Sequence, residues 1–255
     1  MSLNLVRLDR RALVRAAMGG LLVTPLIACN ENPATGRRQF IVVSDDMLEQ
    51  MSAQTWAEIQ RTAPRSQSAA AQRTIEAIGR RIADSSGLSN VNWEFVAFDS
   101  PEVNAFVLPG GKVGFFRGLM ERAESDDELA AVMGHEVGHV IARHAAERVS
   151  QQLGVQLGVQ AAAMALSEDL GEHADLAAAA LGAGLIYGVV LPYSRAHELE
   201  ADRLGVDLMK QSAFDPGGAV SFWEKMIAAQ GETPLAWMST HPANDDRLAA
   251  LRALI

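Results

Sequence analysis

The chain has 255 residues, a formal net charge of −9 and 49% hydrophobic residues. This length suits one domain with an extended N-terminal start. The acidic balance argues against nucleic acid as a partner and against electrostatic docking to anionic lipid. The single cysteine, Cys29, excludes an intramolecular disulfide.

Residues 1–28 are typical of a bacterial export signal. Four arginines precede an apolar stretch of small residues from position 16 onward. The stretch ends in Leu26-Ile27-Ala28-Cys29, the pattern of a lipobox, in which the cysteine is lipidated and becomes the mature N-terminus. Asn30 follows, not the aspartate associated with inner-membrane retention. We therefore expect a lipid anchor at Cys29 that holds the protein on the outer membrane, facing the periplasm.

The rest of the chain reads as an α+β fold with a small sheet. Residues 29–68 are assigned to a polar, lipidated tether and an N-terminal helix, and residues 69–255 to the catalytic domain. Within these parts the sequence predicts helices over about 43–59 and 69–83, an alternating, half-buried strand over 91–98, and a hairpin of 103–108 with 112–116. The pattern beyond is helical.

Residues 151–191 are apolar and rich in alanine and glycine. The sequence favours two close-packed helices here, forming a possible lid, over a membrane-spanning hairpin, because 174–192 reaches a spanning length only marginally.

The segment His135-Glu136-Val137-Gly138-His139 is an HExxH motif. The capping box Ser125-Asp126-Asp127-Glu128 predicts a helix from Asp126 that runs to about Ser150. Residues four apart lie on one helix face, so His135 and His139 can hold one metal ion, while Glu136 can hold a water beside it. Apolar residues on the opposite face predict that this helix can bury one side and offer the other to a metal.

A second motif, Glu198-Leu199-Glu200-Ala201-Asp202, follows on a predicted helix. Glu198 is the preferred third ligand, which leaves a fourth position open for water and substrate, and Glu200 is the alternative. Asp202 shares the face of Glu198 and can accept a hydrogen bond from the outer nitrogen of a ligand histidine. The sequence thus predicts one Zn²⁺ per chain.

The other histidines separate into two groups. His144 lies half a turn from the metal face and is interpreted as structural or surface-exposed, His173 as a solvated loop residue, and His197 as lying behind the ligands at most. His241 precedes a proline and so lies outside a helix. It could pack in a loop, stabilise an oxyanion, or fill the open metal position and keep an enzyme latent.

These motifs resemble those of the gluzincin metallopeptidases that include HtpX, BepA and the CAAX prenyl endopeptidase. The matching segments span about residues 33–255 in the family's order and are 104–116, 118–119, 127–130, 134–139, 194–205, 240–242 and Arg247. The resemblance implies zinc ligands His135, His139 and Glu198, with Glu136 as general base. It also implies that His241 lies near the zinc, and that an edge strand at Asn104, Ala105 and Phe106 borders the substrate cleft.

The chain lacks the long membrane spans of HtpX and the CAAX endopeptidase, and so resembles the soluble periplasmic lipoprotein branch. We expect a zinc endopeptidase that cleaves unfolded or misassembled envelope proteins with a zinc-activated water. The alternative is a chaperone-like outer-membrane assembly factor whose protease activity is latent. The sequence leaves the client, the cleavage site and the oligomeric state open.

Overall fold

The computed structural model describes residues 29–170, 174, 179, 182, 191–229, 236–242 and 245–255. The predicted signal segment 1–28 and His173 lie outside these residues. The chain divides into two compact units, one formed by residues 1–43 and 146–195 and the other by residues 44–145 and 196–255.

The first unit contains a two-stranded antiparallel sheet, β1 (Cys29–Glu31) with β2 (Arg38–Phe40), and most of helix α6 (His144–Leu170). Where the sequence suggested a polar tether, residues 29–40 form this hairpin. Arg37 and Gln39 both donate hydrogen bonds to the buried carboxylate of Glu147 on α6. These bonds fix the hairpin to the helix.

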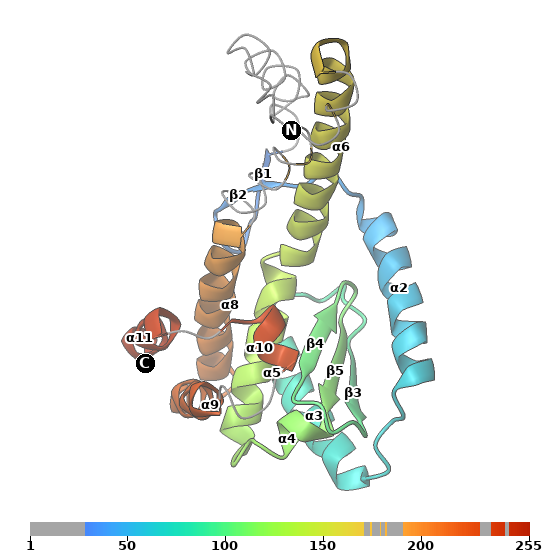
Figure 1. Cartoon of the computed structure of the whole chain (residues 1–255). Helices are drawn as coiled ribbons and strands as arrows, with labels where there is room; N and C mark the ends of the chain where they lie inside the picture. Colours follow the sequence, from blue (N-terminus) through green and yellow to red (C-terminus); the bar gives the residue numbers. More distant parts are fainter. Residues whose placement is uncertain are drawn as a thin grey trace, which may run out of the picture. The chain divides into compact units, whose positions relative to one another are not determined.

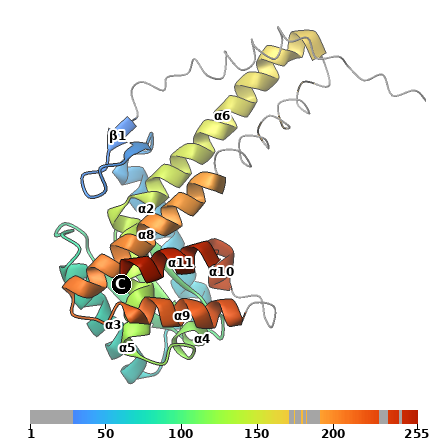
Figure 2. The same ribbon diagram turned by 90° about the vertical axis from the view of Figure 1, so that its left-hand side faces the viewer.

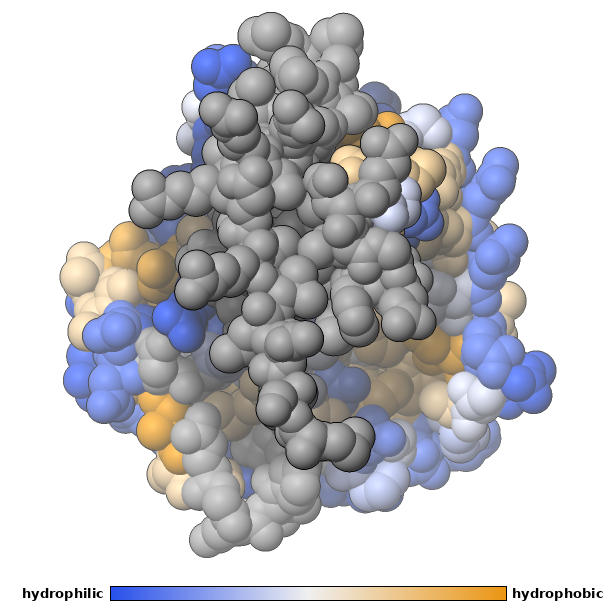
Figure 3. Space-filling view, turned by 45° about the horizontal axis from the view of Figure 1, so that its top comes forward, coloured by the Kyte–Doolittle hydropathy of each residue, from blue (hydrophilic) through white to orange (hydrophobic). Residues whose placement is uncertain are grey.

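Helix α6 supplies the first of the two helices expected over 151–191, and most of the second lies outside the described residues. Among the described helices, none combines the length and the apolar character that a membrane span requires. Large hydrophobic side chains that remain exposed include Met47, Met51, Leu157 and Met164. Hydrophobic residues also show among hydrophilic ones on the face drawn in Figure 3.

The second unit holds the three-stranded sheet and the remaining helices (Figure 1). Its elements in chain order are α2 (Asp45–Thr62), α3 (Ala69–Asp84), β3 (Glu94–Phe98), β4 (Ala105–Leu108), β5 (Lys112–Phe116), α4 (Arg117–Met120), α5 (Asp126–Ile141), most of α8 (Leu191–Gln211), α9 (Gly217–Ala228), α10 (Ala236–Thr240) and α11 (Asp245–Leu254). The mainly helical α+β class is confirmed.

The sheet has the order β3–β5–β4, with β3 parallel and β4 antiparallel to the central strand. The predicted β4–β5 hairpin is therefore confirmed. The strand predicted over residues 91–98 corresponds to β3. The prediction that it is half-buried is wrong, because Phe95 to Phe98 are all buried. On one side α3 approaches so closely that a Cβ on Gly79 would lie 2.4 Å from the Phe95 ring, and on the other Trp56 of α2 packs edge-on against Phe98.

Helix α5 begins as predicted, since the Ser125 hydroxyl accepts a hydrogen bond from the Glu128 backbone N–H at 3.2 Å. It ends at Ile141, however, and not near Ser150. Arg143 adopts a left-handed backbone conformation with φ of 55°, and α6 starts at the next residue. A residue in the left-handed conformation ends a helix and turns the chain. The sequence around Arg143 has no glycine or proline that would predict such a turn.

The face of α5 that carries the two histidines is buried, as is the apolar face. Every residue from Glu128 to His139 is buried. The sheet lies along α5 through β4, α3 and α9 pack against it, and α11 packs against α9 (Figures 1 and 2). The HExxH segment therefore lies in the interior of its unit.

Candidate metal centre

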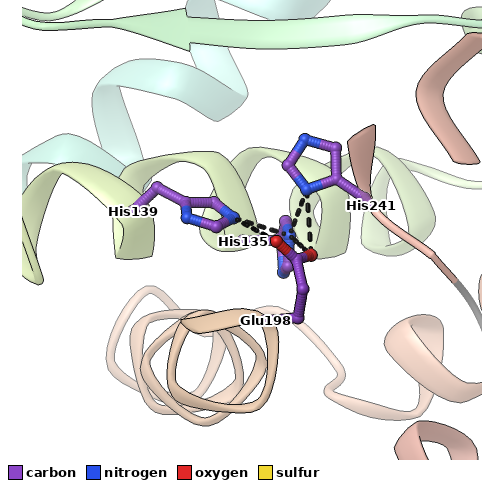
Figure 4. A group of neighbouring side chains, drawn as sticks. All are labelled: His135, His139, Glu198 and His241. Atoms are coloured by element: carbon purple, nitrogen blue, oxygen red, sulfur yellow. Dashed lines mark hydrogen bonds and ion pairs between the residues drawn. The ribbon is translucent and has the colours of Figure 1, made fainter. Parts of the chain in front are cut away.

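Four buried side chains converge at one point of the second unit. His135, His139, Glu198 and His241 each offer one ligand atom, and these atoms all lie within 4.8 Å of one another. The two histidines of α5 approach through Nε2, 3.0 Å apart. Figure 4 shows Glu198 entering from α8 and His241 from the segment that follows α10.

Glu198 bridges the cluster with both carboxylate oxygens. Its Oε2 lies 3.2 Å from His135 Nε2 and 3.0 Å from His241 Nδ1, and its Oε1 lies 3.6 Å from His139 Nε2. His241 Nδ1 also lies 3.1 Å from His135 Nε2. The structure thus brings together the three expected ligands and places the loop histidine with them.

Glycines allow α5 and α8 to cross at close range. A Cβ on Gly134 would lie 2.9 Å from the carbonyl oxygen of Gly205, and one on Gly138 would lie 2.9 Å from that of Ala201. Real Cβ atoms almost never come so near another backbone. This crossing sets the distance at which Glu198 meets the histidines.

Asp202 lies behind His135, as expected of a carboxylate that orients a ligand histidine. Its Oδ1 is 2.8 Å from His135 Nδ1. Arg247 of α11 donates to both Asp202 oxygens at 2.8 Å, and its guanidinium also lies 3.2 Å from Glu198. The guanidinium stacks over Trp223, 4.1 Å from the ring centre. A planar fork of donors suits such a bidentate contact.

The electrostatics of this cluster favour a cation. Burial lowers the pKa of His135, but hydrogen bonds with Asp202 and Glu198 outweigh it and raise the pKa to about 9. Burial would raise the pKa of Glu198, yet its bonds with His135 and His241 hold that pKa well below the usual range. Burial and the neighbouring His135 lower the pKa of His139. The carboxylates that attract a proton to His135 also attract a metal cation.

The donor set fits zinc. Two imidazoles and a carboxylate are a standard ligand combination for catalytic zinc. The buried Glu198 Oε1 accepts no hydrogen bond from any described residue. A buried carboxylate oxygen without a donor is costly, and a metal ion at the cluster would satisfy it.

Glu136 is buried beside the cluster. Its Oε1 accepts a hydrogen bond from Trp237 Nε1 at 3.1 Å and lies 3.5 Å from His241 Nε2. Trp237 stacks on Trp223, with ring centres 4.8 Å apart. The tryptophan therefore holds the carboxylate of Glu136 from one side.

Two further histidines and Glu200 lie beside the cluster, apart from its ligand atoms. His144 is buried, so the surface alternative for it is wrong, and its ring lies 2.8 Å from His139. His197 is also buried and stacks on His144 at 4.1 Å. Glu200, the alternative ligand, contacts His144 at 2.9 Å and lies outside the four-residue cluster.

The expected substrate strand is the sheet edge next to α5. Ala105 is buried in the core, and Phe106 packs against Trp56, Phe98 and Phe116. The Asn104 carbonyl accepts a hydrogen bond from Phe116 in the hairpin. Phe106 is partly buried, and its side chain packs against the hydrophobic core.

The profile of "Peptidase family M48" matches residues 69–255, which include every residue of this cluster. The chain belongs to peptidase family M48. The predicted resemblance is confirmed at this level, and metallopeptidases of this family use zinc.

Curated relatives of this M48 chain come from mitochondria and from bacteria. The mitochondrial metalloendopeptidase OMA1 of Schizosaccharomyces pombe is 37% identical over 85% of this chain and 63% of its own length. OMA1 of Bos taurus is 30% identical over 88% of this chain and 45% of its own length. The beta-barrel assembly-enhancing protease of Escherichia coli is 29% identical over 70% of this chain and 37% of its own length. The chain therefore spans less than two thirds of these relatives.

Two contacts of this M48 site were missed in the sequence. Trp237 and His241 lie four residues apart on one helical turn, where the His241 N–H donates to the Trp237 carbonyl. That spacing was a usable signal for a tryptophan beside the site. The contact of His144 with His139 had no such signal, because it depends on the turn at Arg143.

Replacing Gly134 by alanine should push α5 and α8 apart. The new methyl group would overlap the Gly205 carbonyl, and overpacking of this kind costs about 1–3 kcal/mol of folding free energy. Zinc affinity should fall as well, because Glu198 moves with α8. Urea unfolding and chelator competition measure the two effects.

The matched control is Gly158→Ala on α6, where an added Cβ meets no atom within 4 Å. That variant should be as stable as wild type, or more stable by up to about 1 kcal/mol, since alanine favours a helix over glycine. Equal stability and zinc affinity in Gly134→Ala and wild type would contradict the role given to the close crossing.

Proposed function

We propose that this chain is a zinc-dependent endopeptidase in which His135, His139 and Glu198 hold the metal and Glu136 is the general base. The observation that carries the proposal is the convergence of three buried zinc-type ligands beside a buried glutamate. Membership of family M48 supports the same reaction class.

The proposed reaction is hydrolysis of a peptide bond. When bound, zinc supplies polarisation of the scissile carbonyl and a lowered pKa of the attacking water. Glu136 takes a proton from this water as the new C–O bond forms, and passes it to the amine nitrogen as the C–N bond breaks. The hydrogen bond from Trp237 keeps the carboxylate of Glu136 directed at the site. Asp202 keeps His135 oriented through Nδ1.

The proposed substrates are unfolded or misassembled proteins of the cell envelope. Asn104, Ala105 and Phe106 belong to the edge of the sheet that lies along α5, and an extended substrate can add to such an edge through backbone hydrogen bonds. Backbone pairing reads little of the side chains, which suits loosely specified, unfolded clients.

The proposed location is the outer membrane, facing the periplasm, through a lipid on Cys29. The support is the apolar signal-like segment that ends in Leu26-Ile27-Ala28-Cys29. One relative, the beta-barrel assembly-enhancing protease of Escherichia coli, is bacterial, as this proposal requires. The similarity to mitochondrial OMA1 offers the mitochondrion as the competing location.

The second candidate function is a chaperone-like assembly factor whose peptidase activity is latent. It is favoured by His241, whose Nδ1 lies among the ligand atoms, 3.0 Å from Glu198. A fourth protein ligand would close the position that water and substrate need. The two functions are compatible, because release of His241 would convert one state into the other.

Replacing Glu136 by glutamine tests the proposed reaction. Zinc-loaded wild type, residues 30–255, should cleave an unfolded protein such as casein. Glu136→Gln should keep fold and zinc but lose about 100-fold or more of the rate, because loss of a general base costs that much. Cleavage is followed by gel and mass spectrometry, and zinc content by elemental analysis.

Cleavage at equal rates by both proteins would point to a contaminant or another site and sink the proposal. If neither cleaves casein, and Glu136→Gln still binds clients and restores their assembly, the assembly factor becomes the better description.

Replacing His241 by alanine separates latency from oxyanion stabilisation. If His241 is a fourth ligand, His241→Ala should cleave casein faster than wild type and bind zinc more weakly, since one ligand is lost. The cleavage rate and zinc affinity are measured on the same preparations. A slower rate with unchanged zinc affinity would instead assign His241 to the oxyanion.

Replacing Cys29 by serine tests the anchor. Wild-type protein expressed in a bacterium should partition with the membrane fraction and begin at a lipid-modified Cys29, as read by mass spectrometry. Cys29→Ser should lose the lipid and retain residues 1–28. An unmodified cysteine in the wild-type protein would refute lipidation.

A further inference from the structure

The two ligand histidines are supported from behind in different ways. His135 contacts a carboxylate directly, since its Nδ1 lies 2.8 Å from Asp202. His139 contacts another histidine, because its Nδ1 lies 2.8 Å from Nδ1 of His144. His144 in turn reaches Glu200, with its Nε2 2.9 Å from the carboxylate. His144, which joins Glu200 to His139, lies outside both the HExxH and the ExxxD motif.

If His139 binds a metal through Nε2, the hydrogen bonds along the row His139–His144–Glu200 can have only one direction. His139 presents Nε2 to the cluster, so a neutral ring that binds a metal there carries its proton on Nδ1. That N–H donates to His144 Nδ1, which must then be an acceptor. A neutral His144 carries its own proton on Nε2 and donates it to Glu200. Both of these contacts then join one donor to one acceptor.

The fold holds His144 in the orientation that this order requires. The left-handed conformation of Arg143 turns the chain, so that the ring of His144 lies behind His139 and not half a turn away. His197 stacks on His144 at an interplanar angle of 20°, and both rings are buried. His144 thus has a fixed plane as well as fixed partners.

We propose that His144 and Glu200 are positioning residues that fix the tautomer and ring orientation of His139 for metal binding. The proposal rests on the zinc site of the proposed function and adds two residues to it. Helix α8 then supplies three side chains to the site. Glu198 is the ligand, Asp202 supports His135, and Glu200 supports His139 through His144. Removing a partner behind a ligand histidine typically lowers metal affinity about 10- to 100-fold.

The test compares zinc dissociation constants of purified apoproteins by chelator competition. Glu200→Gln keeps the size of the side chain but removes its charge, and His144→Leu removes the acceptor facing His139. Both should weaken zinc binding, His144→Leu by about 10- to 100-fold and Glu200→Gln by less. His144→Asn should recover much of the affinity, because its amide oxygen can accept from His139 Nδ1.

The control is Asp207→Asn, an exposed carboxylate on the same helix that pairs with Arg203 at 3.5 Å. It should bind zinc as wild type does. Thermal unfolding of the zinc-free proteins detects a merely structural effect. Such an effect would lower the midpoint temperature, but the variants would not rank by zinc affinity as predicted above. Glu200 is partly exposed, so Glu200→Gln keeps the test decisive if His144→Leu fails to fold.

Unchanged zinc affinity in Glu200→Gln and His144→Leu would overturn the positioning role. So would equal losses in His144→Leu and His144→Asn. Failure of wild type to bind zinc would instead defeat the proposed function. The two failures are therefore distinguishable.

Discussion

The close crossing of α5 and α8 is the constraint on which the site depends. Backbone meets backbone at Gly134, Gly138 and Gly205, where even a methyl group has no room. A helix presents its side chains at fixed intervals. This one contact therefore sets the distance between the acidic side chains of α8 and the histidines of α5. A different crossing distance would displace ligand and supporting carboxylates together. The positions of the ligand side chains thus depend on glycines, which carry no side chain, where α5 and α8 cross.

The charges that α8 brings into the interior need compensation. Burying a carboxylate costs several kcal/mol unless hydrogen bonds and opposite charges replace its water. Arg247 supplies both to Asp202, and part of its charge also faces Glu198. Two carboxylates that face one guanidinium leave a net negative charge, which attracts a cation. The electrostatic arrangement therefore favours metal binding over an inert structural ion pair.

The sequence was informative wherever a local rule decides the outcome. Helical spacing predicted that His135 and His139 share a face, and the structure brings them together with Glu198. The capping box at Ser125 predicted the start of α5. The sequence failed where tertiary packing decides. Nothing in Ala142-Arg143 signals a left-handed residue, so the end of α5 and the position of His144 were not predictable. The burial of both faces of β3 depends on α2 and α3, which no alternation within the strand can reveal. The lipid anchor rests on the sequence pattern alone.

Arg247 has a consequence for how the protein is made. Synthesis proceeds from the N-terminus, and 106 residues separate His135 from His241. A nascent chain that has emerged as far as Asp202 already carries the HExxH and ExxxD motifs, but Arg247 is still to come. Its two interior carboxylates then lack their guanidinium, which disfavours closing them away from water. The cluster of His135, His139, Glu198 and His241 is therefore expected to close only after α11 has been made.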